Sequence, residues 1–78
     1  MSSASPVGAI GRVSQSGAIR PGRLGEVLVQ IRGGLEAFLA RDADGGAIEA
    51  GAEVVVVEYL PPRTVVVTRL YPEDRSAP

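Results

Sequence analysis

Two valine-rich runs constrain the fold of this chain more than any other feature of its sequence. The runs are Val54–Val57 and Val65–Val67, and a turn-forming segment, residues 60–63 (Leu-Pro-Pro-Arg), lies between them. Valine is β-branched and favours strands, so the two runs predict a pair of neighbouring strands. Open edges on such apolar strands would promote aggregation, which favours a sheet that closes into a barrel.

Glycine and proline residues divide the chain into short apolar segments, and this pattern is typical of an all-β domain. We expect five strands, at about Gly8–Gln15, Gly25–Arg32, Leu35–Ala40, Ala52–Leu60 and Thr64–Leu70. Gly33-Gly34 separates the second and third strands and predicts a tight hairpin turn. The widest gap, about residues 41–51, lies where an OB-fold usually has its helix, but it predicts one short turn at most. The predicted fold class is therefore all-β, a five-stranded, OB-fold-like small β-barrel with little or no helix.

The fourth predicted strand does not alternate simply. Glu53 and Glu58 are both expected in solvent, yet they lie five positions apart, and a regular strand places such residues on opposite faces. A β-bulge adds one residue to a strand and shifts its alternation. We therefore predict a bulge near Val56 or Val57.

The length of 78 residues allows one small domain, which would bury about 60% of its unfolded surface. We assign the barrel to residues 7–71. Residues 1–6 are expected to be a flexible N-terminal tail or linker, and residues 72–78 a disordered C-terminal tail.

Several reactive residue types are missing from the sequence. It contains no cysteine, histidine, tryptophan or lysine, and its eight basic residues are all arginine. The chain therefore has no histidine-assisted nucleophile, no Schiff-base lysine, no thiolate metal site and no lysine for a lipoyl or biotinyl group. We expect no enzymatic activity, no cofactor and no metal.

Four residues are candidates for contacts with a partner, namely Arg20, Leu28, Arg32 and Phe38. Leu28 is the apolar exception on the otherwise polar face of the second strand, so a contact patch is expected around it. Arg20 begins an Arg-Pro-Gly segment that predicts a type II turn. A second interpretation of this segment makes Arg20 and Arg23 an anion-binding pair, because guanidinium groups suit planar anions.

An alternative function is that of an OB-fold binder of single-stranded nucleic acid or oligosaccharide. In that interpretation Arg20, Arg32 and Arg41 line the binding face, and Phe38 stacks on a base. Nine acidic residues against eight arginines give a net charge of −1, and the chain has only three aromatic residues, so both features disfavour nucleic acid. Phe38 and Tyr59 are equally consistent with core positions.

The order of several short motifs resembles that of the NfeD-like C-terminal domain. These motifs are Gly8-Ala9-Ile10-Gly11-Arg12-Val13, Ile19-Arg20-Pro21-Gly22, Gly25-Glu26-Val27, residues 48–57 (IEAGAEVVVV) and Val65-Val66-Val67. The resemblance covers about residues 7–70, and its order and spacing are more specific than any single motif. Ile19 replaces the leucine that usually precedes Arg-Pro in this family, which is a conservative departure.

The resemblance implies an OB-fold domain attached behind transmembrane helices, so the full-length protein would be membrane-anchored through upstream helices that are absent from this chain. It implies that the domain faces the cytoplasm and is soluble as this fragment. Stomatin- or flotillin-like membrane proteins are the implied partners, in membrane protein quality control. The barrel is not known in the family as an enzyme.

Overall fold

A computed structural model describes residues 5–71, and these form a closed barrel of five strands. The strands are β1 (Ile10–Val13), β2 (Gly25–Ile31), β3 (Gly34–Asp42), β4 (Glu53–Leu60) and β5 (Thr64–Arg69). The order around the barrel is β1-β2-β3-β5-β4, with β3 and β5 parallel and every other pair antiparallel. This is the all-β, OB-fold-like barrel predicted from the sequence. The predicted tails lie outside the described residues, apart from Ser5 and Pro6.

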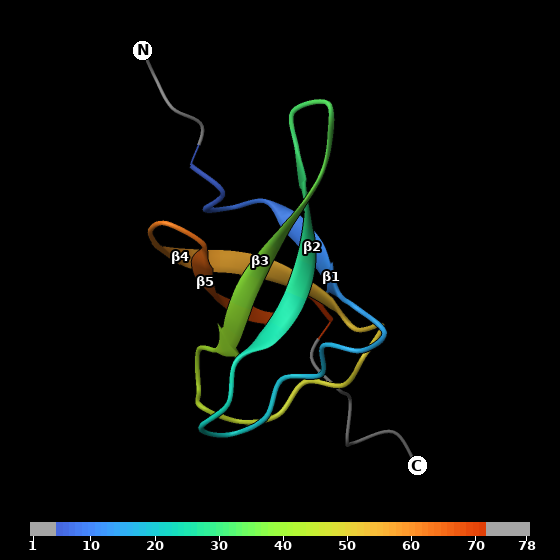
Figure 1. The fold of residues 1–78 in the computed structure, drawn as a ribbon, viewed down its shortest axis with the longest axis vertical. Helices are drawn as coiled ribbons and strands as arrows, with labels where there is room; N and C mark the ends of the chain where they lie inside the picture. The colour runs from blue at the N-terminus through green and yellow to red at the C-terminus, as the bar shows by residue number, and fades with distance from the viewer. Residues whose placement is uncertain (1–4, 72–78) are drawn as a thin grey trace.

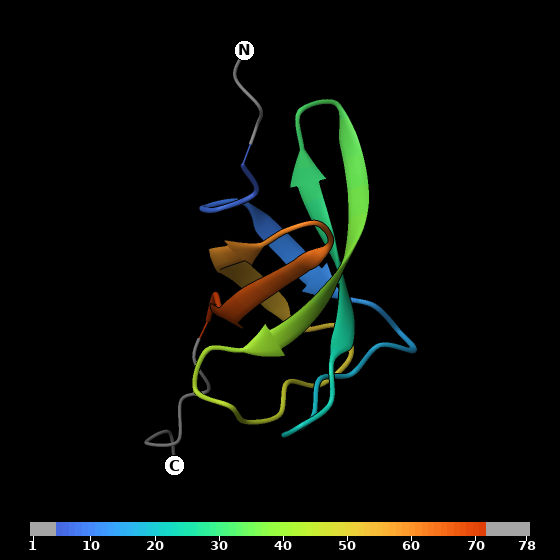
Figure 2. The ribbon, with the colours of Figure 1, turned by 60° about the vertical axis from the view of Figure 1, so that its left-hand side comes forward.

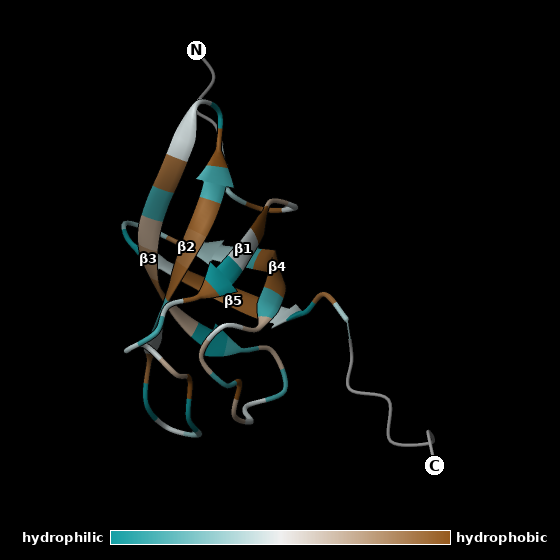
Figure 3. Ribbon diagram, turned by 90° about the vertical axis from the view of Figure 1, so that its right-hand side faces the viewer, coloured by the Kyte–Doolittle hydropathy of each residue, from teal (hydrophilic) through white to brown (hydrophobic). Residues whose placement is uncertain are grey.

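The barrel interior is filled mainly by valine, because alternate residues of each strand point inward. Figure 3 shows bands of different hydropathy along β2 and β3. The buried core comprises Val13, Ile19, Val27, Val29, Phe38, Ala40, Ile48, Val54, Val56, Val65 and Val67. Within residues 5–71, no polar or charged residue is buried. Burial of apolar surface is therefore the main source of stability in this domain.

Strand β4 contains the predicted bulge. The pairing of β4 with β5 shifts between Val56 and Glu58, which leaves Val57 as the additional residue. Val57 is 46% exposed, whereas Val56 is 1% exposed. Because of the bulge, the side chain of Tyr59 points inward and packs against the core.

The β2–β3 hairpin turn differs from the prediction by one residue. Ile31 pairs with Gly34, so the two turn residues are Arg32 and Gly33 rather than Gly33 and Gly34. Only Gly33 has a positive φ, of 88°. A positive φ at the second central residue alone is the pattern of a type II turn, which accepts an arginine at the first position.

The segment between β3 and β4 contains no helix. Its residue Ile48 forms two backbone hydrogen bonds with Ile19 of the β1–β2 loop, with N–O distances of 2.9 and 3.0 Å. Both isoleucine side chains are 1% exposed and belong to the core. The two loops therefore close this end of the barrel with a pair of buried side chains.

The two ends of the domain differ in construction. The β2–β3 hairpin extends beyond the other strands at one end, and the β1–β2 and β3–β4 loops lie together at the other (Figures 1 and 2). Strand β3 pairs with β5 only from Leu39 to Asp42, so its first half continues into the hairpin without that neighbour. Within residues 5–71, no helix is long and apolar enough to span a membrane.

Candidate interaction surface

The four candidate residues occupy four separate parts of the domain. Arg20 lies in the β1–β2 loop at the loop end, and Arg32 lies in the hairpin turn at the opposite end (Figure 1). Leu28 lies in β2 between these ends, and Phe38 lies in the core. The structure therefore does not bring the four residues together in one site.

Phe38 is inside the barrel and is only 5% exposed. Its ring makes an edge-to-face contact with Tyr59, with 6.2 Å between the ring centroids. The Arg63 guanidinium carbon lies 4.7 Å from the centre of the same ring. Phe38 thus occupies a core position, and its ring offers little surface on which a base or a partner could stack.

Leu28 lines an exposed groove of about 300 Å³, which we call the Leu28 groove. Its lining residues are Ile10, Gly11, Arg12, Leu28, Gln30, Leu35 and Glu53. Ile10 is 46% exposed and Leu35 is 64% exposed. Apolar side chains from three adjacent strands therefore gather on the outer surface around the residue that the sequence identified.

Strand register explains why these side chains meet. In antiparallel strands, directly opposed residues share a face. Arg12 lies opposite Leu28, and Gln30 lies opposite Leu35. These residues all point outward, because their neighbours Val27 and Val29 fill the core.

An ion pair lies at the edge of the Leu28 groove. Arg12 Nη2 donates to Glu53 Oε2 at 3.0 Å, and the two side chains are 61% and 36% exposed. Such an exposed pair contributes at most about 1 kcal/mol to stability. Its more evident effect is to give an apolar groove a polar rim, as protein interfaces commonly have.

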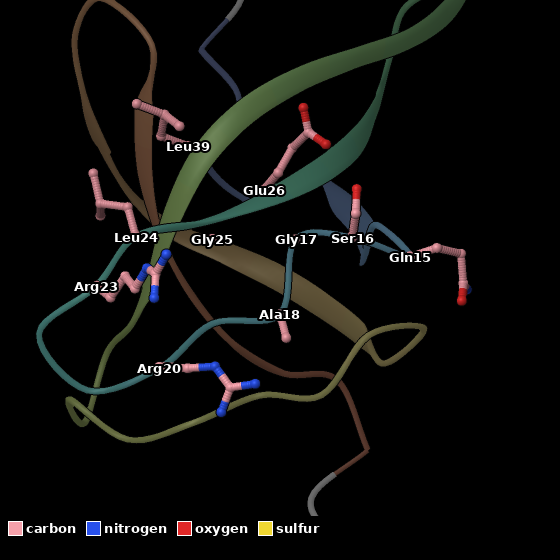
Figure 4. Close-up of a pocket in the computed structure, with 10 residues that line it drawn as sticks. All are labelled: Gln15, Ser16, Gly17, Ala18, Arg20, Arg23, Leu24, Gly25, Glu26 and Leu39. Carbon is pink, nitrogen blue, oxygen red and sulfur yellow. The ribbon is translucent and has the colours of Figure 1, made fainter.

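A second hollow, of about 400 Å³, lies at the loop end, and we call it the arginine hollow. Arg20, Arg23 and Arg41 all line it, together with Gly22, Leu24, Asp42, Gly45 and Gly46. An adjoining hollow shares Arg20, Arg23 and Leu24 (Figure 4). Of the three arginines considered for a binding face, Arg20 and Arg41 are therefore close together and Arg32 is distant.

The Arg20 loop has the predicted turn. Arg23 N donates to Arg20 O at 3.0 Å, and Gly22 has a φ of 74°. Proline at the first central position and glycine at the second match a type II turn. The turn places Arg20 and Arg23 at its two ends, on the rim of the arginine hollow.

Glu49 and Arg69 form an ion pair that affects the pKa of Glu49. The pKa of Glu49 lies below its ordinary value, because its carboxylate accepts a hydrogen bond from its own backbone N–H and another from Arg69. Arg69 Nη1 lies 2.8 Å from Glu49 Oε1. No group of three histidine, cysteine or acidic residues within the described range is arranged to hold a metal ion.

The sequence profile of the NfeD C-terminal domain matches residues 10–68. The chain belongs to this family. The match agrees with the resemblance seen in the Gly, Arg-Pro-Gly and valine motifs, and it covers all five strands up to Thr68.

Two solved structures are similar to this domain. The soluble domain of the NfeD protein YuaF from Bacillus subtilis is 29% identical with a TM-score of 0.69, and the match covers 85% of this chain and 75% of that one. The C-terminal domain of stomatin operon partner protein 1510-C from Pyrococcus horikoshii is 33% identical with a TM-score of 0.66, covering 85% and 89%. Among curated proteins, no sequence match was found.

The sequence did not identify Ile10 and Leu35 as neighbours of Leu28 on this NfeD domain. Leu35 could have been found from the hairpin alone, because a two-residue turn at Arg32 and Gly33 places it opposite Gln30. Ile10 comes from β1, and no local signal indicates how β1 aligns with β2. The predicted third strand ends at Ala40, one residue before Arg41, whereas β3 in the structure continues through Arg41 to Asp42.

Proposed function

We propose that this NfeD domain is a non-enzymatic protein-interaction module that docks on a stomatin- or flotillin-like membrane protein through the Leu28 groove. In this proposal the domain belongs to a membrane-anchored protein and faces the cytoplasm. Its role is in membrane protein quality control, and the anchor lies outside this chain.

The observation that carries the proposal is the gathering of Ile10, Leu28 and Leu35 on the outer surface of three strands. An apolar centre with a polar rim has the composition of a protein interface. The 1510-C protein, whose C-terminal domain has a similar structure, is named as a stomatin operon partner, which supports this class of partner.

The alternative, binding of single-stranded nucleic acid or oligosaccharide, has less support. Such binders use exposed aromatic rings as stacking platforms. Phe38 is buried, and Tyr59 is partly buried with its hydroxyl donating to Pro62 O at 3.0 Å. Among residues 5–71, Tyr71 alone has a largely exposed aromatic ring, at 72%.

The experiment measures binding of this domain to the soluble part of a stomatin-like protein from the same genome, by calorimetry and ¹H–¹⁵N NMR. We expect amide shifts along the outer face of β1 and β2 and at Leu35. Ile10→Ser and Leu35→Ser should each weaken binding about fivefold, because each removes roughly 1 kcal/mol of apolar contact.

Val57→Ser is the control for Ile10→Ser. Val57 and Ile10 are each 46% exposed, but Val57 does not line the Leu28 groove. Equal weakening by both variants would contradict the Leu28 groove as the docking surface. Salt-sensitive binding of single-stranded oligonucleotides, in place of protein binding, would favour the alternative function.

A further inference from the structure

The arginine hollow concentrates positive charge that the rest of the described domain does not neutralise. Three other arginines, Arg12, Arg63 and Arg69, form ion pairs with glutamates at 2.8–3.0 Å. By contrast, no carboxylate in residues 5–71 lies within ion-pair distance of the arginines of the hollow. Among the residues that the structure describes, Arg20, Arg23 and Arg41 therefore have no ion-pair partner, unlike the three paired arginines.

The charge of the lining residues has the opposite sign to that of the whole chain. Three arginines and Asp42 line the hollow, which gives a net charge of +2, and the adjoining hollow that contributes Leu39 adds Glu26, so the combined surface carries a net charge of +1. The whole chain carries −1. Asp42 Oδ2 already accepts the Gly46 N–H at 2.9 Å, so part of that carboxylate is engaged with the backbone.

Backbone hydrogen bonds hold the loops that carry these side chains. The β1–β2 loop is fixed by the Arg20–Arg23 turn and by the pair of bonds between Ile19 and Ile48. In the β3–β4 loop, Gly45 N donates to Asp42 O at 2.9 Å. A ligand would therefore meet loops whose backbone is already in place, so the entropic cost of binding falls mainly on the arginine side chains.

Two exposed leucines adjoin the arginines. Leu24 is 45% exposed and lines the hollow, and Leu39 is 46% exposed and lines the adjoining hollow. Figure 4 shows Leu24 directly beside Arg23, with Leu39 on the same side of the view. The surface thus offers apolar contacts next to guanidinium groups.

We infer that the arginine hollow binds an acidic protein segment that carries aliphatic side chains next to its carboxylates. Guanidinium groups bind carboxylates with paired, charge-assisted hydrogen bonds, and Leu24 and Leu39 accept the aliphatic neighbours. This binding site lies at the opposite end of the domain from the hairpin, and it is separate from the docking surface of the proposed function.

The chemistry of the hollow favours a protein segment over an anionic membrane. Adsorption to anionic lipid typically requires clusters of four to eight basic residues. The hollow has three arginines and one aspartate, in a chain that is negative overall. A single concave site of this size fits one or two carboxylates and an adjacent apolar side chain.

The test uses this chain and a fluorescein-labelled octapeptide in which leucine alternates with glutamate. The same peptide with glutamine in place of glutamate is the neutral control. Fluorescence anisotropy at about 50 mM salt should show binding of the acidic peptide alone, and added salt should weaken it. Arg20→Gln, Arg23→Gln and Arg41→Gln should each weaken binding about two- to fivefold, as expected for exposed ion pairs.

Arg32→Gln is the matched control, because it removes the same charge from an exposed arginine in the hairpin turn, at the other end of the domain. Its affinity for the peptide should equal that of the unmodified chain. Equal weakening by Arg32→Gln and Arg41→Gln would overturn the proposal, since net charge would then explain the binding. Equal affinity for the acidic and neutral peptides would also overturn it.

Other occupants are distinguished by separate measurements on the same variants. Inorganic phosphate and vesicles containing phosphatidylglycerol are titrated in parallel. If either binds with the same dependence on Arg20, Arg23 and Arg41 while the acidic peptide does not, the assignment to a protein segment is wrong. Concentration-dependent self-association that Arg41→Gln abolishes, without peptide binding, would instead assign the hollow to a second copy of this chain.

Discussion

Arg63 lies across Phe38, with the guanidinium carbon 4.7 Å from the centre of the ring. The same side chain donates from Nη1 to Glu36 Oε2 at 2.9 Å and from Nη2 to the carbonyl oxygen of Ala37. Strand β5 pairs with β3 only from Leu39 onward, so Arg63 covers the part of the β3 edge that has no neighbouring strand. Sheet edges that remain open are sites of unwanted pairing, and a charged side chain is one means of protecting them.

Arg63→Ala should lower the free energy of unfolding by about 1 kcal/mol, through loss of an exposed cation–π contact and an exposed ion pair. It should also promote self-association, because the β3 edge at Ala37 becomes accessible. Urea unfolding and sedimentation velocity measure the two effects. Arg32→Ala is the control, and a variant of Arg63 that stays monomeric at millimolar concentration would contradict the protective role.

Gly25→Ala should be strongly destabilising. A Cβ atom at Gly25 would lie 2.7 Å from Ile19 Cγ1 and would overlap the carbonyl oxygen of Gly17. Because backbone as well as a buried side chain would have to move, we expect a loss of about 3 kcal/mol. For a domain of this size, that loss lowers Tm by more than about 10 °C.

Gly34→Ala provides the control for Gly25→Ala. A Cβ at Gly34 meets no atom within 4 Å, and Gly34 is not among the glycines with positive φ. Alanine costs less conformational entropy than glycine in a strand, so this variant should gain about 0.5 kcal/mol. Equal destabilisation by both variants would show that the close contact at Gly25 is not the cause.

Ile48→Ala should cost about 3 kcal/mol in the free energy of unfolding, because it leaves a cavity where the two loops close the barrel. Leu35→Ala removes an apolar side chain that is 64% exposed, and it should change stability by less than about 0.5 kcal/mol. Thermal unfolding of both variants measures the difference. Similar Tm values would contradict the role of Ile48 as a core residue.

The Glu49–Arg69 pair predicts a dependence of stability on pH. The pKa of Glu49 is lowered from 4.5 in the folded state, so its contribution is present above 4.5 and is lost as pH falls through the lowered value. Glu49→Gln should therefore be less stable than the unmodified chain at pH 7, and the two should converge in acid. Urea midpoints from pH 7 to pH 2 measure this effect.

Glu58→Gln is the control for the pH experiment. Glu58 is exposed and forms no ion pair within residues 5–71. Its substitution removes one negative charge without breaking an ion pair among the described residues, so it controls for the change in net charge. A gap between Glu49→Gln and the unmodified chain that persists to pH 2 would contradict the assigned cause.

The strands could be predicted because their signals are local, whereas barrel closure was inferred from the aggregation risk of open valine-rich edges. β-Branched runs, glycine and proline positions, and the spacing of Glu53 and Glu58 all lie within a few residues of the features they determine. The predicted bulge is confirmed for the same reason. The predicted hairpin turn, at Gly33-Gly34, is one residue later than the observed one. Either pair of positions allows a two-residue loop, and strand pairing selects Arg32 and Gly33.

The pairing of Ile19 with Ile48 could not be predicted, because 28 intervening residues separate positions that meet only after the barrel forms. The candidate surface shows the same limit. Leu28 was identified from alternation within one strand, whereas its neighbour Ile10 depends on the register between β1 and β2. Arg20 and Arg32 were grouped by residue type, and the fold places them at opposite ends.

The additional residue in β4, Val57, determines which of the following residues in that strand point inward. Val54 and Val56 point inward, and strict alternation would next direct Glu58 into the core. With Val57 unpaired, Tyr59 takes the inward place and its ring meets Phe38. The β-bulge and the spacing between the valine run and Tyr59 are therefore matched, because the same sequence in a regular strand without the bulge would place the Glu58 carboxylate inside the barrel instead of the aromatic ring.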